Sequence, residues 1–455
     1  MQSKNRSLTE GSIWKSMLLF ALPLFLGNVL QQMYNTFDAW CVGHYIGDNA
    51  LAAVSSSGSL IFMMVSFITG VSTGVSVIVA RDFGAKEYDT MGKAIHTAIA
   101  AGLITGAALS VAGVALTPTI LRWMGTPAEV LPQSIEYFAY YFCGVIFTVM
   151  YNILVGVLHA VGDSKHPLYY LIFSTCLNIV LDMLFVAVLG FGVGSAAIAT
   201  TVSQGVSAVL CFVHLIRIDA PYRVCVRKIR IHRGSLLEII RYGLPSGVQF
   251  SVISLANVVV QANINSFGKA AMAGCGAYSK LEGFAFLPVN CFTQALATFV
   301  GQNLGARQYE RTKKGVAFGI LCCCISAELI GLLCYWLAPQ MIGIFSQSAD
   351  SIGLGTAHMR TICLFYFLMA FSHCIASVLR GAGKASVPMF TMLICWCALR
   401  MAYVSIAVRF VNQLTTVSWA YPITWTCSSI IFLIYFLTAD WIHNFDREEA
   451  KKKIA

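Results

Sequence analysis

Polar side chains recur at helical spacing near the start of this chain, inside a segment that is otherwise apolar. Asn28, Gln31, Asn35 and Asp38 are separated by three, four and three residues. On a helix of about 3.6 residues per turn, this spacing places them on one narrow face. An ionised aspartate inside a bilayer costs roughly 2.5 to 3.5 kcal/mol on the insertion scale. We therefore expect this face to look inward and Asp38 to hold a partner, a proton or a cation.

A second intramembrane carboxylate lies in the sequence CLNIVLDMLF. Asn178 and Asp182 are four residues apart and share one face of the expected helix, and Thr200 follows the glycine-rich turn GFGVGSAA. Two carboxylates, an amide oxygen and a hydroxyl are hard oxygen ligands, which suit Na⁺ or a shared proton and do not suit soft metals. We predict that Asp38, Asn178, Asp182 and Thr200 form one cation-coupling site, with no cofactor besides H⁺ or Na⁺.

The composition indicates which elements must position these groups. Only 11% of the 455 residues are charged and 58% are hydrophobic, with a mean hydropathy of +0.74, whereas a soluble domain carries roughly a quarter charged residues. Apolar runs long enough to cross a bilayer recur along the chain. They predict an all-α integral membrane protein with twelve transmembrane helices, near residues 15–40, 51–80, 93–117, 133–158, 166–190, 194–216, 236–264, 278–301, 315–338, 356–379, 388–410 and 416–440.

The basic residues set the expected orientation. Lys and Arg gather at the termini and in the even-numbered connections, including residues 217–241, whereas the odd-numbered connections carry few. This bias predicts that both termini are cytoplasmic. Because the net charge of +10 is spread over short segments, a nucleic-acid partner is not expected. The cysteines show no paired ligand spacing, and His159, His214 and His373 are expected to be merely hydrogen-bonded.

The chain contains an internal repeat. VARDFGAKEYDTMGK from Val79 resembles VGQNLGARQYERTKK from Val300, an offset of 221 (300 − 79), and LHAVGDSKHP resembles LRGAGKASVP at the same offset. Six helices per copy keep both copies in the same orientation. We predict two parallel-repeat six-helix bundles around a central cleft, divided as an N-terminal lobe over residues 1–220, a linker over 221–241 and a C-terminal lobe over 242–455. Pro23 lies inside the first helix, where it favours a bend.

The two copies differ in their acids. The first helices match at an offset of 222, which places Val260 opposite Asp38 (38 + 222), and the offset of 221 places Tyr403 opposite Asp182 (182 + 221). Because only the first copy carries the two carboxylates, we interpret them as serving a specialised task and not folding alone.

Other polar residues are candidates for contact with a substrate. Glu282 could contact a substrate or cation, or pair with Lys280. Arg400 could repel cationic substrates or pair with a carboxylate such as Glu282. Glu328 is expected to serve packing in a protonated or paired state. The residues assigned to a substrate cleft are Asn28, Gln31, Tyr34, Asn35, Gln249, Glu282 and Arg400.

The duplicated twelve-helix layout, the stretch NTFDAWCVGHYIGDNALAAVS, the pair GAKEYD and GARQYE, LHAVGDSKHP and NIVLD together resemble the multidrug and toxic compound extrusion (MATE) family over essentially the whole chain. The resemblance implies export of amphipathic, often cationic, drug-like compounds in exchange for H⁺ or Na⁺ across a bacterial inner membrane. It also implies that Asp38, Asn178, Asp182 and Thr200 bind the coupling ion and that the first helix bends at Pro23. We expect a monomer, because both lobes lie in one chain.

Two other functions would require features different from those of an antiporter. A flippase for a lipid-linked precursor would need a strongly cationic cleft for a pyrophosphate group, and Arg400 is the one candidate. A membrane-embedded enzyme would need a catalytic cluster near the membrane surface, and the loops show no Asp-rich or HxxxxD-like grouping. The sequence therefore favours a transporter over an enzyme.

Overall fold

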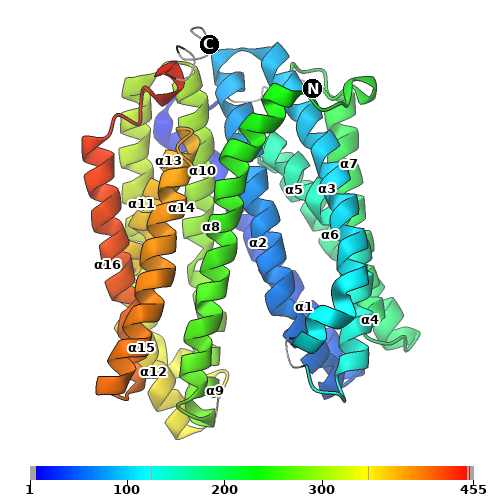
Figure 1. The fold of residues 1–455 in the computed structure, drawn as a ribbon, viewed down its shortest axis with the longest axis vertical. Helices are drawn as coiled ribbons and strands as arrows, with labels where there is room; N and C mark the ends of the chain where they lie inside the picture. Colours follow the sequence, from blue (N-terminus) through cyan, green and yellow to red (C-terminus); the bar gives the residue numbers. More distant parts are fainter. Residues whose placement is uncertain (1–6, 124–125, 347, 448–449, 451–455) are drawn as a thin grey trace. The chain divides into compact units, whose positions relative to one another are not determined.

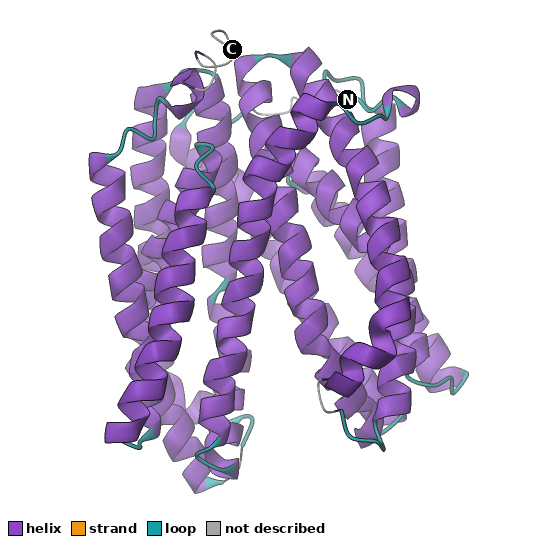
Figure 2. Ribbon diagram, in the orientation of Figure 1, coloured by secondary structure: helices purple, strands orange, loops and turns teal. Residues whose placement is uncertain are grey.

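The computed structural model describes residues 7–123, 126–346, 348–447 and 450. Within these residues every regular element is a helix (Figure 2). Figure 1 labels the α-helices. In chain order, the elements are α1 (Ile13–Tyr45), α2 (Asp48–Ala85), α3 (Tyr88–Trp123), α4 (Leu131–Cys143), α5 (Val145–Ala160), α6 (Lys165–Asp182), η1 (Met183–Val188), α7 (Gly194–Arg217), η2 (Val226–Lys228), α8 (Arg233–Asn265), α9 (Lys269–Ala285), α10 (Leu287–Gly305), α11 (Tyr309–Gly343), α12 (Ala349–Cys363), α13 (Tyr366–Gly381), α14 (Ser386–Met392), η3 (Leu393–Leu399), α15 (Arg400–Phe410) and α16 (Leu414–Thr438).

The helices are long and apolar enough to cross a membrane. Ten spans in the described residues meet this test, and two bent pairs raise the number to twelve. The bent pairs are α4 with α5, at 46°, and α12 with α13, at 51°. Large apolar side chains such as Trp123, Trp336 and Phe410 are more than 70% exposed, as expected for surfaces that face lipid. The structure thus confirms the predicted all-α membrane fold.

The chain forms two compact units. One contains residues Leu26–Leu244, and the other contains Leu8–Phe25 together with the chain from Pro245 onward. The first helix of each repeat is therefore shared: α1 passes from one unit to the other after Phe25, and α8 does so after Leu244. Each change of unit lies beside a buried or partly buried proline inside the helix, Pro23 in α1 and Pro245 in α8.

The backbone repeats as the sequence does. Helices α2, α3, α5 and α6 begin 221 residues before α9, α11, α13 and α14, respectively. The left-handed backbone positions match at the same offset: Gly162 has φ +87° and Gly383 has φ +78°. Lys86 and Arg307, at φ 60° and 56°, form a second matched pair directly before α3 and α11. The predicted duplication is therefore present in the local backbone geometry as well as in the amino-acid sequence.

Each repeat uses the same two positions to hold the start of a first helix or the chain just before it. In the first unit Arg81 bridges Asp82, at 2.7 Å, and Glu238 of α8, at 3.0 Å. The matching residues in the second unit are Gln302 and Asn303. Gln302 accepts the backbone N–H of Leu8 at 2.9 Å, and Asn303 donates to the Leu8 carbonyl at 3.3 Å. One copy thus holds α8 through charges, and the other holds the chain before α1 through neutral amides.

Helices approach one another closely where glycines face each other. A Cβ built on Gly74 of α2 would lie 2.3 Å from the backbone of Gly243 in α8, and one on Gly274 of α9 would lie 2.7 Å from the backbone nitrogen of Gly355 in α12. Small residues permit this contact between backbones, which is a common way for membrane helices to associate.

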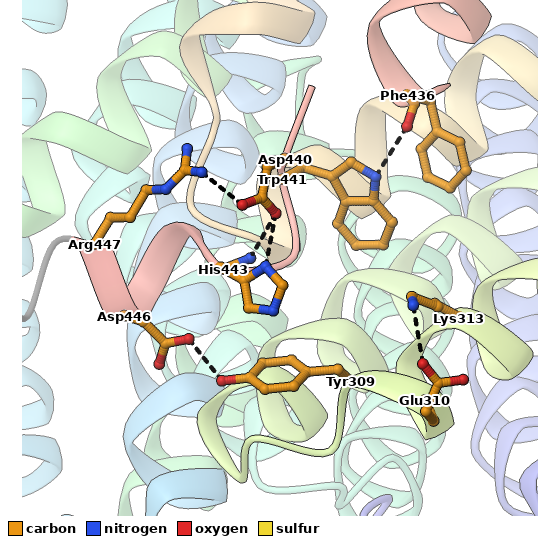
Figure 3. Close-up of polar contacts among 9 residues, drawn as sticks. All are labelled: Tyr309, Glu310, Lys313, Phe436, Asp440, Trp441, His443, Asp446 and Arg447. Carbon is orange, nitrogen blue, oxygen red and sulfur yellow. Dashed lines mark hydrogen bonds and ion pairs between the residues drawn. The ribbon is translucent and has the colours of Figure 1, made fainter. Parts of the chain in front are cut away.

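The C-terminal segment is tied to the start of α11 (Figure 3). The Tyr309 hydroxyl donates to Asp446 at 2.6 Å, while Asp440 accepts hydrogen bonds from the Arg447 guanidinium at 2.6 Å and from His443 Nδ1 at 2.9 Å. The His443 hydrogen bond holds the pKa of Asp440 below its usual range. These contacts fix residues 440–447 against the second unit.

Candidate functional site

The cation-site residues predicted from sequence all lie in the first unit. Asp182 and Asn178 sit on α6 with no exposed surface, and Asp38 on α1 is 8% exposed. Thr200 on α7 accepts a hydrogen bond from the Tyr34 hydroxyl at 3.0 Å. Because Tyr34 is one turn before Asp38, this bond ties the polar face of α1 to the helix that carries Thr200.

The carboxyl and amide atoms at the centre of this site lack internal partners. Both carboxyl oxygens of Asp182, both side-chain polar atoms of Asn178 and Oδ1 of Asp38 are buried without a hydrogen bond. The carboxyl groups of Asp38 and Asp182 are close enough to interact electrostatically. Leaving buried polar groups unpaired costs about 1 to 3 kcal/mol each, and more for charged groups. These atoms therefore keep unused capacity to bind a proton or an ion.

Aromatic residues close the site on the side of α4. Tyr34 and Tyr137 are buried and interact electrostatically with both carboxyl groups, and the partly buried Tyr141 lies beside these two rings. Tyr137 belongs to an apolar cluster with Cys41, Val42 and Val186, among others. Sequence reasoning missed Tyr137 and Tyr141, because their approach to α1 depends on tertiary packing and leaves no local spacing signal.

The backbone is irregular directly after Asp182. There α6 continues as the π-helical segment η1, Met183–Val188. In the second unit the π-helical segment η3, Leu393–Leu399, ends directly before Arg400. Single π-helical turns in α-helices often mark functional positions, because they shift the side chains that follow. Both segments therefore adjoin residues that the sequence singled out.

The donor set of this site suits a small hard cation or a proton. Asp38, Asp182, Asn178 and Thr200 offer carboxylate, amide and hydroxyl oxygens, which are the ligands of alkali and alkaline-earth ions. The unpaired buried oxygens of Asp182 and Asn178 supply free acceptor capacity. The residues present thus fit Na⁺ or H⁺ as an exchanged ion, and the set contains no thiolate or imidazole.

The remaining polar residues of the α1 face differ in exposure. Asn28 and Gln31 are half-buried, Tyr34 is buried and Asn35 is exposed. The polar face of α1 therefore includes both an exposed residue, Asn35, and the buried carboxyl group of Asp38. Its assignment to a substrate cleft stays a prediction.

In the second unit, Glu282 lies in an aromatic environment. The Tyr278 hydroxyl donates to Glu282 at 2.8 Å and is 3.3 Å from the Tyr366 hydroxyl. Glu282 also interacts electrostatically with Arg400. Lys280 instead lies over the ring of Phe345, 5.6 Å from its centroid. Of the two partners considered from sequence, the structure brings Arg400 into the surroundings of Glu282.

Arg400 is enclosed by aromatic rings and by the polar side chains of Asn257 and Thr424. Its guanidinium carbon is 4.6 Å from the centre of the Tyr421 ring and 5.1 Å from that of Trp396. It donates to Asn257 at 3.2 Å and to Thr424 at 3.0 Å. Arg400 is 1% exposed, so this cation is stabilised by π faces and hydrogen bonds within its own unit.

Gln249 and Glu328 have other neighbours. Gln249 is 1% exposed and accepts a hydrogen bond from Arg380 at 3.2 Å. Glu328 accepts the backbone N–H of Phe367 at 3.2 Å, at the bend between α12 and α13. The latter contact agrees with the packing role expected for Glu328.

The fold and the site together define a class: a multi-pass membrane carrier built from two six-helix repeats, with two buried carboxyl groups, Asp38 and Asp182, in the first of them. The MatE family model matches residues 23–184 and again residues 245–406, once per repeat. The chain belongs to the MatE family.

Similar proteins cover nearly the whole chain. The "Probable multidrug resistance protein YoeA" of Bacillus subtilis is 28% identical over 84% of this chain and 84% of its own length. The "Probable multidrug resistance protein YpnP" of the same organism is 26% identical over 90% of this chain and 92% of its own. A solved structure described as the outward-facing conformation of a multidrug resistance MATE family transporter matches with TM-score 0.89 and 23% identity, over 100% of both chains. The similarity to this solved structure, at 23% identity, establishes the fold of the chain.

Proposed function

We propose that this protein is a secondary active multidrug efflux transporter, which exports amphipathic and often cationic compounds in exchange for H⁺ or Na⁺. The observation that carries the proposal is the pair of buried carboxyl groups, Asp38 and Asp182, with polar atoms that have no partner within the fold. The names of the relatives YoeA and YpnP support drug-like substrates. They favour this function over flipping of a lipid-linked precursor.

The exchange follows from competition for negative charge. With Asp38 and Asp182 ionised, a lipophilic cation gains from the carboxylates and from the faces of nearby rings such as Tyr34. When H⁺ or Na⁺ from outside occupies the carboxyl groups, this attraction ends and the substrate leaves. The inward movement of one positive charge gains about 2.3 kcal/mol per 100 mV of membrane potential. This gain offsets the cost of moving a monovalent cationic substrate outward, so the concentration gradient of H⁺ or Na⁺ drives the net export.

The rearrangement that follows ion binding involves α1. Asp38 lies on the part of α1 that belongs to the first unit, and Pro23 lies in the part that belongs to the second. Pro23 removes one helical hydrogen bond, which lowers the cost of bending at the place where α1 changes unit. Pro23 is thus suited to be the hinge between the two parts of α1.

The protein is proposed to act as a monomer in a bacterial inner membrane, with both termini in the cytoplasm. The supporting observation is the excess of Lys and Arg in the termini and even-numbered connections. Each chain contains both repeats, so one copy supplies the complete set of helices.

The test uses purified protein in liposomes loaded with a fluorescent lipophilic cation, with a proton gradient and a Na⁺ gradient imposed separately. Efflux driven by one of them, and absent from protein-free liposomes, is expected and identifies the coupling ion. Absence of transport under both gradients, combined with movement of a fluorescent lipid-linked pyrophosphate between leaflets, would replace this proposal with the flippase.

A further inference from the structure

Two histidines and an aspartate meet at one end of the first unit, away from the proposed coupling site. Asp163 lies in the connection between α5 and α6, His166 in the first turn of α6, and His214 in the last turn of α7. Helices α6 and α7 pack against each other (Figure 1). Within the described part of the chain, this is a group of three potential ligands whose donor atoms lie within 4.8 Å of one another.

The geometry of the group is compact. His166 Nδ1 is 2.6 Å from Asp163 Oδ2, and His214 Nε2 is 3.8 Å from the same oxygen. The two imidazole rings have centroids 4.2 Å apart. Ligand atoms around a tetrahedral zinc ion are roughly 3.3 Å apart, given bonds of about 2.0 Å. Small side-chain rotations would bring all three donors to that separation.

A purely structural role explains only part of this arrangement. Asp163 Oδ1 accepts the backbone N–H groups of Lys165 and His166, each at 3.2 Å, which caps the start of α6. Burial acts to raise the pKa of Asp163, but the hydrogen bond from His166 and its charge hold that pKa below its usual range. His214 takes no part in this cap: its Nε2 is buried, has no hydrogen-bond partner and faces the carboxylate at a distance too long for a hydrogen bond.

The second repeat serves as an internal comparison. At the offset of 221, the positions of Asp163, His166 and His214 are occupied by Lys384, Val387 and Tyr435. The turn itself is preserved, since Gly162 and Gly383 share a left-handed backbone. Because the same turn forms without these side chains, the turn does not require the three donors.

We propose that Asp163, His166 and His214 bind a divalent transition metal, with Zn²⁺ as the best fit to two imidazoles and one carboxylate. Three protein ligands with a fourth position open to water are a common zinc arrangement. His166 binds through Nδ1 as the neutral tautomer protonated on Nε2, and His214 binds through Nε2. The ion replaces the proton between His166 and Asp163, so binding releases a proton and weakens as the pH falls.

The nearby charges limit the affinity. Lys165 interacts electrostatically with His166 and opposes an added positive charge. Asp163 is the single carboxylate among the three ligands. We therefore expect weaker binding than at a closed structural zinc site. The bound ion would link the end of α7 to the start of α6, on the side predicted to face the cytoplasm.

The test measures zinc affinity by competition with a fluorescent chelator, using full-length protein in detergent after removal of metals. His214→Ala and His166→Ala are each expected to lower the affinity for one zinc ion by at least tenfold. Even residues that only hydrogen-bond to a metal ligand change metal affinity by about 10- to 100-fold. The matched control is His443→Ala, because His443 forms the same Asp-x-x-His pair with Asp440 at 2.9 Å but has no second histidine among the described contacts. This control is expected to bind zinc as the parent protein does.

A second measurement does not depend on variants that fold. X-ray absorption of the zinc-loaded parent protein is expected to show nitrogen and oxygen ligands only. Unchanged affinity in His214→Ala, an equal loss in His443→Ala, or sulfur ligands from the 16 free cysteines would each overturn the proposal. Transport is not a readout here, so the result is independent of the proposed efflux function.

Discussion

Replacing Arg81 by glutamine removes the charge that two carboxylates share. Arg81 Nη2 is 2.7 Å from Asp82 and 3.0 Å from Glu238, and the Asp82 side chain is only 3% exposed. Breaking a buried ion pair by removing one partner costs about 3 to 5 kcal/mol, because the remaining charge is left uncompensated. Arg81 and Glu238 are each 18% exposed, so water offsets part of the loss. We expect Arg81→Gln to destabilise the protein by about 3 kcal/mol, the lower end of that range.

The second repeat indicates how to restore stability. Gln302 and Asn303 occupy the positions of Arg81 and Asp82 and form neutral hydrogen bonds. The double variant Arg81→Gln with Asp82→Asn has the same residues as this pair. It removes the buried charge of Asp82, which the single variant leaves without Arg81. The partly exposed Glu238 then loses its ion pair with Arg81, and the expected loss is about 1 kcal/mol. The double variant is therefore expected to be more stable than the single one.

Unfolding of the purified protein in a mild detergent measures these differences. Lys93→Ala serves as the control, because the Lys93–Asp89 pair has a similar distance of 2.6 Å but is exposed. Its melting temperature is expected to match that of the parent protein. The reasoning is refuted if Arg81→Gln unfolds together with the control, or if the double variant is no more stable than the single variant.

Three further predictions concern packing, the coupling site and pH. Gly74→Ala places a Cβ 2.3 Å from the backbone of Gly243. Because the backbone cannot easily move away, we expect the free energy of unfolding in detergent to fall by an amount near the upper end of about 1 to 3 kcal/mol. The control is Gly92→Ala, whose added Cβ has no atom within 4 Å. Tyr34→Phe removes the hydrogen bond to Thr200 and is expected to lower the free energy of unfolding by about 1 kcal/mol. It is also expected to change the ion concentration that gives half-maximal transport. The control Tyr140→Phe, at an exposed residue, should change neither the stability nor this concentration. The lowered pKa of Asp163 means that its stabilisation is present above the unfolded value near 3.9 and is lost as the pH falls through the folded value. In the presence of a chelator, Asp163→Asn should therefore melt at a lower temperature than the parent protein at pH 6. This difference should begin to narrow near pH 4 and should narrow further as the pH falls through the folded pKa of Asp163. A difference that stays constant down to pH 3 would contradict the assignment.

The sequence predicted the helices well, because span length and hydropathy are local properties. Charge composition and apolar runs identified the membrane class, and the 221-residue offset identified the repeat that reappears in Gly162 and Gly383. The sequence did not indicate the bends at Gly144 and near Phe365, because the apolar runs continue through both. It also did not indicate that α1 and α8 each contribute to both compact units, since this depends on contacts between distant segments.

The candidate site was accessible from sequence only where its residues share a helix. Asn178 and Asp182 are four apart, so their common face could be inferred from spacing alone. The bond between Tyr34 and Thr200 joins residues 166 positions apart, and His214 reaches His166 through the packing of α7 on α6. Neither contact has a periodic signal. The sequence expectation that His214 is merely hydrogen-bonded was wrong for its Nε2, which is buried without a partner.

The most direct test of the central claim is whether substrate binding expels the coupling ion from Asp38 and Asp182. Calorimetric titration of a lipophilic cation into purified protein, repeated in buffers of different ionisation enthalpy and with and without Na⁺, gives the number of protons or sodium ions released. The parent protein is expected to release one of these ions for each substrate bound, and Asp182→Asn and Asp38→Asn are expected to release fewer or none. Glu328→Gln, a carboxyl variant in the other unit that contacts the backbone N–H of Phe367, is expected to release as many as the parent. Undiminished release by Asp182→Asn and Asp38→Asn would contradict the account.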